Sequence, residues 1–149
     1  MTTPETATPA AYKKPLPRKT KVNTPYWEAL KNHELRLPKC RVCGHIWHPP
    51  ASPVCPNCLT QGDYEFVKLS GRGKIWSWLN MHQRYFPGFA DELPYNIIYV
   101  ELEERPGLRM MSNLVDYNEE HLRCDQPVEI VFDDVTEEWT LPKFRPVKG

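Results

Sequence analysis

Four cysteines in two closely spaced pairs are the residues whose types and spacing point most directly to chemistry. Cys40 and Cys43 form one CxxC motif, and Cys55 and Cys58 form a second after eleven intervening residues. Two residues between paired cysteines let a tight turn aim both sulfurs at one point, and a short connection brings both pairs onto the same ion. The pattern predicts a closed, structural zinc site whose metal supplies about 10–16 kcal/mol of folding free energy.

Three other uses of paired cysteines are alternatives to zinc. Disulfide bonds are not expected, because the chain begins Met-Thr-Thr-Pro without the basic and apolar regions of an export signal. A redox CxxC usually occurs once, near a βαβ pattern, whereas this chain carries it twice at the spacing of a zinc ribbon. Iron in the same four-sulfur cage is the main rival.

Histidines near the cysteines raise the question of a catalytic site. His45 and His48 lie between the two motifs, but four cysteines already fill the tetrahedron and leave no position for water or substrate. We therefore expect both histidines to lie around the metal or at the surface. His121 and Cys124 could form a nucleophile and its base, but no orienting residue is evident, so a free thiol near a surface histidine is favoured.

A short helix is expected immediately before the cysteines. Thr24 followed by Pro25 is typical of an N-cap and a first helical position, and the helix should end near Asn32. Tyr26 and Trp27 lie on or near one face of it. This aromatic face either packs on its own domain or reaches a ligand or another subunit.

The residues after the cysteines predict a small antiparallel barrel. Short strand patterns alternate with turn residues, and no long helical period interrupts them. The expected strands are 65–69, 74–81, 95–102, 108–115, 128–135 and 139–141, with one helical turn at 118–122. Strands of this number and length fit an OB-type barrel. The predicted fold is therefore mainly β, with an N-terminal helix and zinc ribbon followed by a small antiparallel OB-fold barrel.

Two tryptophans in the expected strand 74–81 predict an aromatic face on that strand. Simple alternation places Trp76 and Trp78 together, opposite Ile75 and Leu79. If the two tryptophans face outward, they cover the ribbon or the helix, or they line a ligand surface.

Composition divides the chain into a tail at 1–22, the helix and ribbon at 23–63, and the barrel at 64–146. The tail is rich in proline and lysine and is expected to be disordered, because it has little to bury. It carries five Lys/Arg and one acid, so the remainder is mildly acidic. That charge argues against nucleic acid as the main partner. No apolar run approaches the roughly 20 residues of a membrane span, so a cytoplasmic protein is expected.

Several segments together resemble the family that joins a rubredoxin-like zinc ribbon to a C-terminal OB-fold, often called acyl-CoA-associated OB-fold proteins. The matching stretches, spread over 24–146, are PYW, LPKCRVCGHIWHPP, PVCPNC, GRGKIWSW, PGF, ELPYNIIYVELEE, MSNLVD and PVEIVFDDVTEEWTLPKFRP. Two features depart from the family pattern: the long basic tail, and the turn beginning at Arg105, where relatives commonly have a simpler acidic-glycine turn.

The resemblance implies a noncatalytic accessory subunit in a hetero-oligomer with a thiolase-fold protein, with a coenzyme A thioester as the ligand of the complex. Alternatives are a MaoC-like hydratase or thiolase-like aldolase partner, a single-stranded nucleic-acid-binding barrel, and a free-standing enzyme. An acyl-CoA site needs apolar walls for pantetheine and cations near the phosphates. The apolar candidates are Trp27, Phe86, Phe89 and Tyr95, and the cationic ones are Lys31, Arg72, Lys74 and Arg84.

Overall fold

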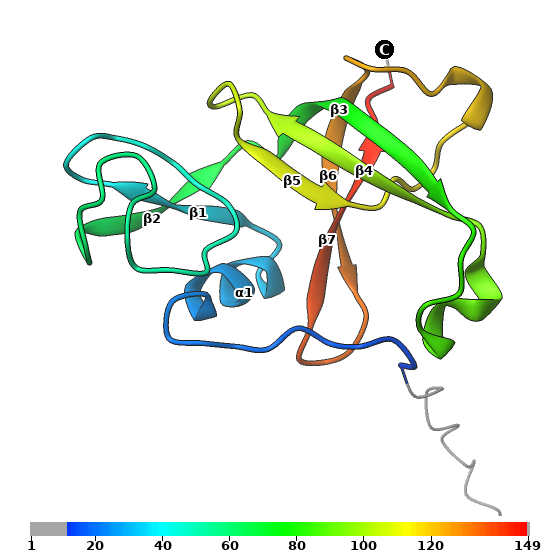
Figure 1. Ribbon diagram of the computed structural model, residues 1–149, viewed down its shortest axis with the longest axis horizontal. Helices are drawn as coiled ribbons and strands as arrows, with labels where there is room; N and C mark the ends of the chain where they lie inside the picture. Colours follow the sequence, from blue (N-terminus) through cyan, green and yellow to red (C-terminus); the bar gives the residue numbers. More distant parts are fainter. Residues whose placement is uncertain (1–11, 149) are drawn as a thin grey trace, which may run out of the picture.

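The computed structural model describes residues 12–148, which form one short helix, two short 3-10 helices and two β-sheets (Figure 1). The elements are α1 (Thr24–Lys31), β1 (Leu35–Cys40), β2 (Tyr64–Leu69), β3 (Arg72–Met81), η1 (Pro87–Glu92), β4 (Tyr95–Leu102), β5 (Arg109–Ser112), η2 (Glu119–His121), β6 (Pro127–Asp134) and β7 (Thr140–Pro146). The fold is mainly β, as the sequence predicts. Among the described residues, no helix is both long and apolar enough to cross a membrane.

Helix α1 covers the joint between the two sheets. Its buried residues include Tyr26 and Leu30, which pack into the same core as the strands. The expected cap is shifted by one residue, because Asn23 and not Thr24 is the N-cap. The Asn23 side chain does not cap the helix but accepts a hydrogen bond from Thr20 N at 2.7 Å, which closes the turn that leads into α1.

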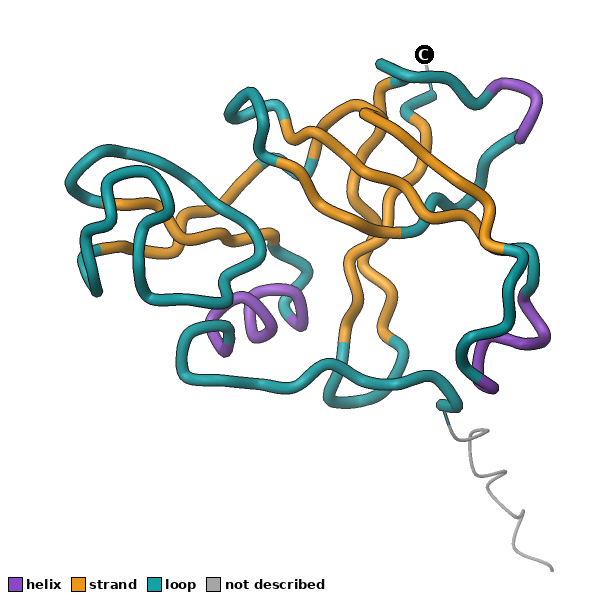
Figure 2. The backbone as a smooth tube through the Cα atoms, viewed as in Figure 1, coloured by secondary structure: helices purple, strands orange, loops and turns teal. Residues whose placement is uncertain are grey.

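Strands β1 and β2 form a small antiparallel sheet of their own, with Leu35 opposite Leu69 and Cys40 opposite Tyr64. The chain between them, 41–63, is almost entirely loop (Figure 2). Residues 65–69, expected as a strand of the barrel, lie outside the five-stranded sheet. They pair with β1 instead, because the leucines that face one another in these strands are buried beside α1.

The larger sheet has the strand order β5-β4-β3-β6-β7, with every neighbouring pair antiparallel. It curls into a barrel (Figure 1), and a parallel bridge between Leu114 and Phe144 joins the two outer strands. The side chain of Asn96 reinforces this closure by accepting from Leu114 N and donating to Leu114 O. The closed five-stranded arrangement is the predicted OB-type barrel.

Strand β3 contains a bulge at Trp76, the extra residue where its register against β4 shifts. After the bulge, Trp78 lies opposite the buried Ile98, whereas Trp76 packs against the exposed Tyr99 with ring centroids 6.1 Å apart. One extra residue inverts the alternation of side chains, so the register places the two tryptophans on opposite faces of the strand, although both side chains are exposed. For the same reason Leu79, which simple alternation groups with Ile75, is exposed while Ile75 is buried.

Residues 12–22 pass under α1 and the β6–β7 turn toward η1 (Figure 1). Lys19 Nζ lies 2.7 Å from Glu28, and Lys14 Nζ lies 2.5 Å from Glu92 and 5.0 Å from the centre of the Phe89 ring. Residues 1–11 of the expected tail lie outside the described residues. The disorder of the tail stays a prediction.

Candidate functional site

The four cysteines meet in the loops of the ribbon. Cys40 ends β1, Cys43 follows in the first turn, and Cys55 and Cys58 lie in the second turn. Their sulfur atoms all lie within 4.8 Å of one another, and the Cys40–Cys58 and Cys43–Cys55 pairs are 3.6 Å apart. Sulfurs at the corners of a zinc tetrahedron lie about 3.8 Å apart when each Zn–S bond is about 2.3 Å. The cluster therefore fits a tetrahedral metal ion.

The two cysteine turns have the same backbone geometry. In the first, Gly44 N donates to Cys40 O at 2.9 Å, and Gly44 has φ of 78°. In the second, Leu59 N donates to Cys55 O at 2.9 Å, and Leu59 has φ of 63°. Both turns thus place a left-handed residue directly after the second cysteine, but only the first uses glycine there.

Hydrogen bonds around the cluster favour the thiolate form that a metal requires. Asn57 Nδ2 donates to Cys43 Sγ at 3.5 Å and lowers the pKa of that thiol. A hydrogen bond with Thr60 lowers the pKa of Cys58 to about 6. Cys43 and Cys58 thus favour the thiolate, whereas the pKa of Cys40 is raised to about 11.

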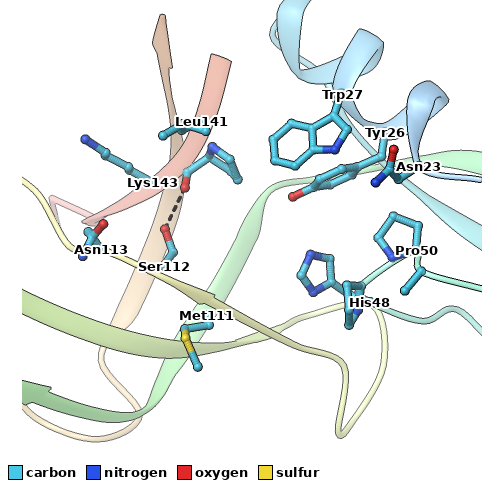
Figure 3. Close-up of a pocket in the computed structure, with 13 residues that line it drawn as sticks. Asn23, Tyr26, Trp27, His48, Pro50, Met111, Ser112, Asn113, Leu141 and Lys143 are labelled. Carbon is cyan, nitrogen blue, oxygen red and sulfur yellow. Dashed lines mark hydrogen bonds between the residues drawn. The ribbon is translucent and has the colours of Figure 1, made fainter. Parts of the chain in front are cut away.

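An apolar cavity of about 360 Å³ lies where α1, the ribbon and the barrel meet (Figure 3). Its lining residues are Asn23, Tyr26 and Trp27 from the start of α1, His48, Pro49, Pro50 and Ala51 from the ribbon, Met111, Ser112 and Asn113 from the end of β5, and Leu141, Pro142 and Lys143 from β7. In Figure 3 the two aromatic rings of α1 face Leu141 across the space. The volume lies in the range of small-molecule sites.

The walls of this first cavity are electrically neutral. Burial lowers the pKa of His48 to about 4, so its imidazole is uncharged at neutral pH. Burial also raises the pKa of Tyr26, which stays a phenol. Lys143 forms an ion pair with Asp133 at 2.5 Å, so its charge is compensated. The cavity therefore suits an uncharged chain.

Trp27 is fixed by its neighbours at one wall. Its ring lies edge-on to Tyr26 and Trp139, with centroid distances of 4.9 and 5.2 Å. Its indole Nε1 is buried and has no hydrogen-bond partner among the described residues. A buried donor without an acceptor costs about 1–3 kcal/mol.

A second cavity, of about 500 Å³, lies between the ribbon and the β4–β5 edge of the barrel. It shares His48, Pro49 and Met111 with the first cavity, and its other lining residues are His45, Trp47, Pro56, Tyr99, Arg105, Gly107, Leu108 and Arg109. Arg105 donates from Nε and Nη2 to Ile46 O at 3.0 and 2.8 Å. The unusual turn noted in the sequence thus ties the barrel to the ribbon.

The eight candidate acyl-CoA residues are divided among several places. Trp27 lines the first cavity. Phe86, Phe89 and Tyr95 form a cluster at η1, with centroid distances of 6.5 and 5.1 Å between successive rings, and none of them lines the cavities described above. A role for this cluster in binding acyl-CoA or a partner stays a prediction.

The cationic candidates are likewise dispersed. Arg72 forms an ion pair with Glu103 at 3.0 Å, and Lys74 pairs with Asp125 at 3.4 Å at the same end of the barrel. Lys31 and Arg84 are exposed, the first at the end of α1 and the second in the loop before η1.

The sequence singled out Trp27 as a ligand candidate, and it placed His45 and His48 around the metal or at the surface, whereas both line a cavity. Most of the other lining residues were not found from the sequence. Met111 and Lys143 lie on strands far from α1 in the sequence, and no local pattern links them to it. Met111 is exposed on β5, but nothing in the sequence places it opposite α1.

The candidate nucleophile Cys124 does not engage its candidate base. Its thiol donates a hydrogen bond to Trp76 O at 3.5 Å, whereas His121 lies in η2. Among the described residues, no hydrogen bond joins the thiol to this imidazole. The geometry gives no activated nucleophile at this position.

Two family models match this chain, one over the zinc ribbon and one over the barrel. Residues 27–65 match the ChsH2 rubredoxin-like zinc ribbon domain, and residues 66–133 match the ChsH2 C-terminal OB-fold domain. The chain is 35% identical, over 108 residues, to a DUF35 domain-containing scaffold protein of Methanothermobacter thermautotrophicus, covering 72% of this chain and 78% of the relative. The chain belongs to this DUF35 family of zinc-ribbon and OB-fold proteins, and the match to a zinc ribbon together with the cysteine geometry supports structural zinc.

Two further relatives are enzyme subunits by name. A probable enoyl-CoA hydratase alpha subunit of Thermomonospora curvata is 34% identical over 133 residues, which are 89% of this chain but 40% of that protein. The benzoylsuccinyl-CoA thiolase subunit BbsA of Thauera aromatica is 33% identical over 105 residues, which are 65% of this chain and 62% of that protein. The chain thus spans less than two thirds of the length of either relative.

A solved structure described as an Ltp2-ChsH2(DUF35) aldolase contains a chain that is 34% identical to this one. It superposes with a TM-score of 0.76 and covers 88% of this chain and 98% of its own. The likeness therefore extends over both the ribbon and the barrel.

Proposed function

We propose that the chain is a noncatalytic accessory subunit of a thiolase-type complex that processes acyl-CoA, and that it supports acyl-CoA binding and assembly of the catalytic partner. The observation that carries the proposal is the neutral cavity walled by Tyr26, Trp27 and Met111 at the joint of helix, ribbon and barrel. Such walls suit the largely uncharged pantetheine arm of coenzyme A.

The polar groups of the cavity favour holding a ligand over reacting with it. Ser112 Oγ donates its proton to Pro142 O at 2.7 Å, so its hydroxyl is directed to a backbone carbonyl and away from a base (Figure 3). His48 is neutral and packs edge-on to Tyr26 at 5.7 Å. In this reading the catalytic groups belong to the partner subunit.

The metal site has a structural role in this proposal. Cys40, Cys43, Cys55 and Cys58 would hold zinc in a closed set of four ligands, which leaves no position for a substrate. The metal fixes the loop that carries His48 and Pro50 into the wall of the cavity. Zinc would thereby support ligand binding without taking part in the reaction.

The relatives support an accessory role in acyl-CoA chemistry. One is named as a thiolase subunit, one as a hydratase alpha subunit, and others as scaffold proteins. A thiolase-like aldolase partner is the second candidate, favoured by the match over 98% of a chain in the aldolase structure. A MaoC-like hydratase partner is the third, and the match there reaches 40% of the relative.

The test is co-production of the chain with thiolase, aldolase and hydratase partners from its own source, followed by assays of each partner with and without the chain. We expect one partner to form a stable complex and to need the chain for full activity. Trp27→Ala should raise the KM of that complex for acyl-CoA about tenfold by loss of an aromatic wall. Tyr85→Ala, an exposed aromatic of the η1 loop, is the matched control and should stay within about twofold. Full activity of all partners without the chain would contradict the proposal.

A further inference from the structure

The second cavity differs from the first in the charge of its lining residues. Its lining contains two arginines and two histidines and no aspartate or glutamate. Lys143 in the first cavity has a carboxylate partner, but Arg105 in the second donates to the backbone carbonyls of Ile46 and Pro106. Among the described residues, no carboxylate forms an ion pair with Arg105. Its positive charge is therefore uncompensated at the wall of a cavity.

The hydrogen-bonding capacity of Arg105 is only partly used. A guanidinium has five N–H donors in a fixed plane, and three are taken by the bonds to Ile46 O and Pro106 O. These bonds hold the plane in place while two donors stay available. A pre-oriented guanidinium with free donors matches the oxygen atoms of a phosphate.

Arg109 brings a second guanidinium to the same cavity, and this one forms an ion pair with Glu101. Its guanidinium lies 3.9 Å from the centre of the Trp76 ring, which fixes its direction. Its Nε is 3.3 Å from a carboxylate oxygen of Glu101, but the geometry is not that of a hydrogen bond, and this buried nitrogen has no hydrogen-bond partner among the described residues. With Arg109 balanced by Glu101, Arg105 is the arginine that leaves the cavity net positive, and Arg109 adds oriented N–H donors beside it.

We infer that the second cavity binds a phosphate group, carried by a ligand whose uncharged arm occupies the first cavity. The two cavities share His48, Pro49 and Met111, so one ligand can span both. The identity of that ligand rests on the proposed function: it would be coenzyme A, with a phosphate at Arg105 and Arg109 and pantetheine beside Trp27. The cationic site thus combines Arg105, from the turn in which this chain departs from its family, with Arg109 at the start of β5, and contains none of the four cations chosen from sequence.

The experiment measures binding to the full, zinc-loaded chain by isothermal titration calorimetry with coenzyme A, dephospho-coenzyme A, pantetheine and inorganic phosphate. We expect coenzyme A to bind at least about tenfold more tightly than pantetheine, because charge-assisted phosphate contacts are lost in the latter. Arg105→Gln should weaken coenzyme A about tenfold and leave pantetheine unchanged. Inorganic phosphate should compete with coenzyme A and not with pantetheine.

The matched control is Arg145→Gln, because Arg145 is a barrel arginine paired with Glu129 at 2.9 Å and lines neither cavity. Its coenzyme A affinity should stay within about twofold. Zinc content and near-ultraviolet circular dichroism report whether each variant folds. If Arg105→Gln does not fold, Arg109→Gln is measured in its place. Equal affinities for coenzyme A and pantetheine, or no effect of either arginine variant, would overturn the inference.

Two results separate this inference from the proposed function. Arginine-dependent binding of inorganic phosphate without binding of coenzyme A would support the phosphate site and contradict the choice of ligand. In the other result, the partner's activity depends on the chain, but Arg105→Gln and Arg109→Gln do not change the affinity of the chain for coenzyme A. This result would agree with the accessory role and overturn the phosphate site.

Discussion

The zinc ribbon and the OB barrel are stabilised by different means. Beside the cysteines, the buried cluster of the ribbon contains only Trp47, with Tyr64 packed against it, whereas one continuous apolar core joins α1, β1 and the barrel. A region with so little apolar surface to bury depends on its metal, and a region with a full core does not. Because the two cavities lie between these regions, the ligand sites depend on both kinds of stability.

The largest expected effect is the unfolding of the zinc ribbon after loss of one cysteine ligand. Cys55→Ser should reduce bound zinc from about one ion per chain to none and unfold residues 41–63, because metal binding supplies about 10–16 kcal/mol in such modules. Elemental analysis and hydrogen exchange of the ribbon amides measure both effects. Cys124→Ser is the matched control and should keep the metal, since Cys124 lies outside the cluster. An iron content in place of zinc would change the metal assignment.

A smaller loss of stability is expected when a buried side chain of the barrel is truncated. Phe144 is fully buried at the closure of the barrel, so Phe144→Ala should lower the free energy of unfolding by about 3–5 kcal/mol. Phe86→Ala, at an exposed position, should change it by less than about 0.5 kcal/mol. Urea unfolding followed by circular dichroism gives both values. Equal losses for the two phenylalanines would mean that the barrel core is not where the structure has it.

Acid should weaken the joint between the two regions through His48. Its pKa is about 4 in the folded chain and about 6.5 when unfolded, so between these values the unfolded state binds a proton that the folded state does not. The free energy of unfolding should therefore fall as the pH drops from 6.5 to 4, by at most about 3 kcal/mol.

The measurement for His48 is urea unfolding at pH 7 and pH 4.5, compared with His48→Gln. Loss of zinc in acid affects both proteins, so the contribution of His48 is the part of the pH dependence that His48→Gln removes. An identical pH dependence in the two proteins would show that the imidazole is not buried.

The smallest effects are expected from substitutions at the left-handed residues of the two cysteine turns. Gly44→Ala should destabilise the ribbon by about 1 kcal/mol, because alanine is strained at its φ of 78° although no atom is in the way. Leu59→Gly relieves the same strain in the second turn and should stabilise the ribbon by up to about 1 kcal/mol, less the entropy cost of glycine. Thermal unfolding of the zinc-loaded chain reads both. Stabilisation of the ribbon by Gly44→Ala, or destabilisation by Leu59→Gly beyond the entropy cost of glycine of about 1 kcal/mol, would contradict the expected left-handed strain.

The sequence could predict the metal site because its four ligands come from two short local motifs. It could also predict strands and barrel from alternation, as the expected bounds 95–102 agree with those of β4. It could not predict the bulge at Trp76, because a bulge depends on pairing with another strand. Nor could it predict the cavities, because Tyr26, Pro50 and Met111 meet only when helix, ribbon and barrel pack together.

In the proposed function this chain is a subunit that completes an acyl-CoA enzyme. Native mass spectrometry of the untagged chain, isolated from its own source and with metal content read on the same sample, tests this most directly. We expect a stable complex with a thiolase-fold subunit and one zinc ion per copy of this chain. A zinc-bearing monomer with no partner would contradict the account.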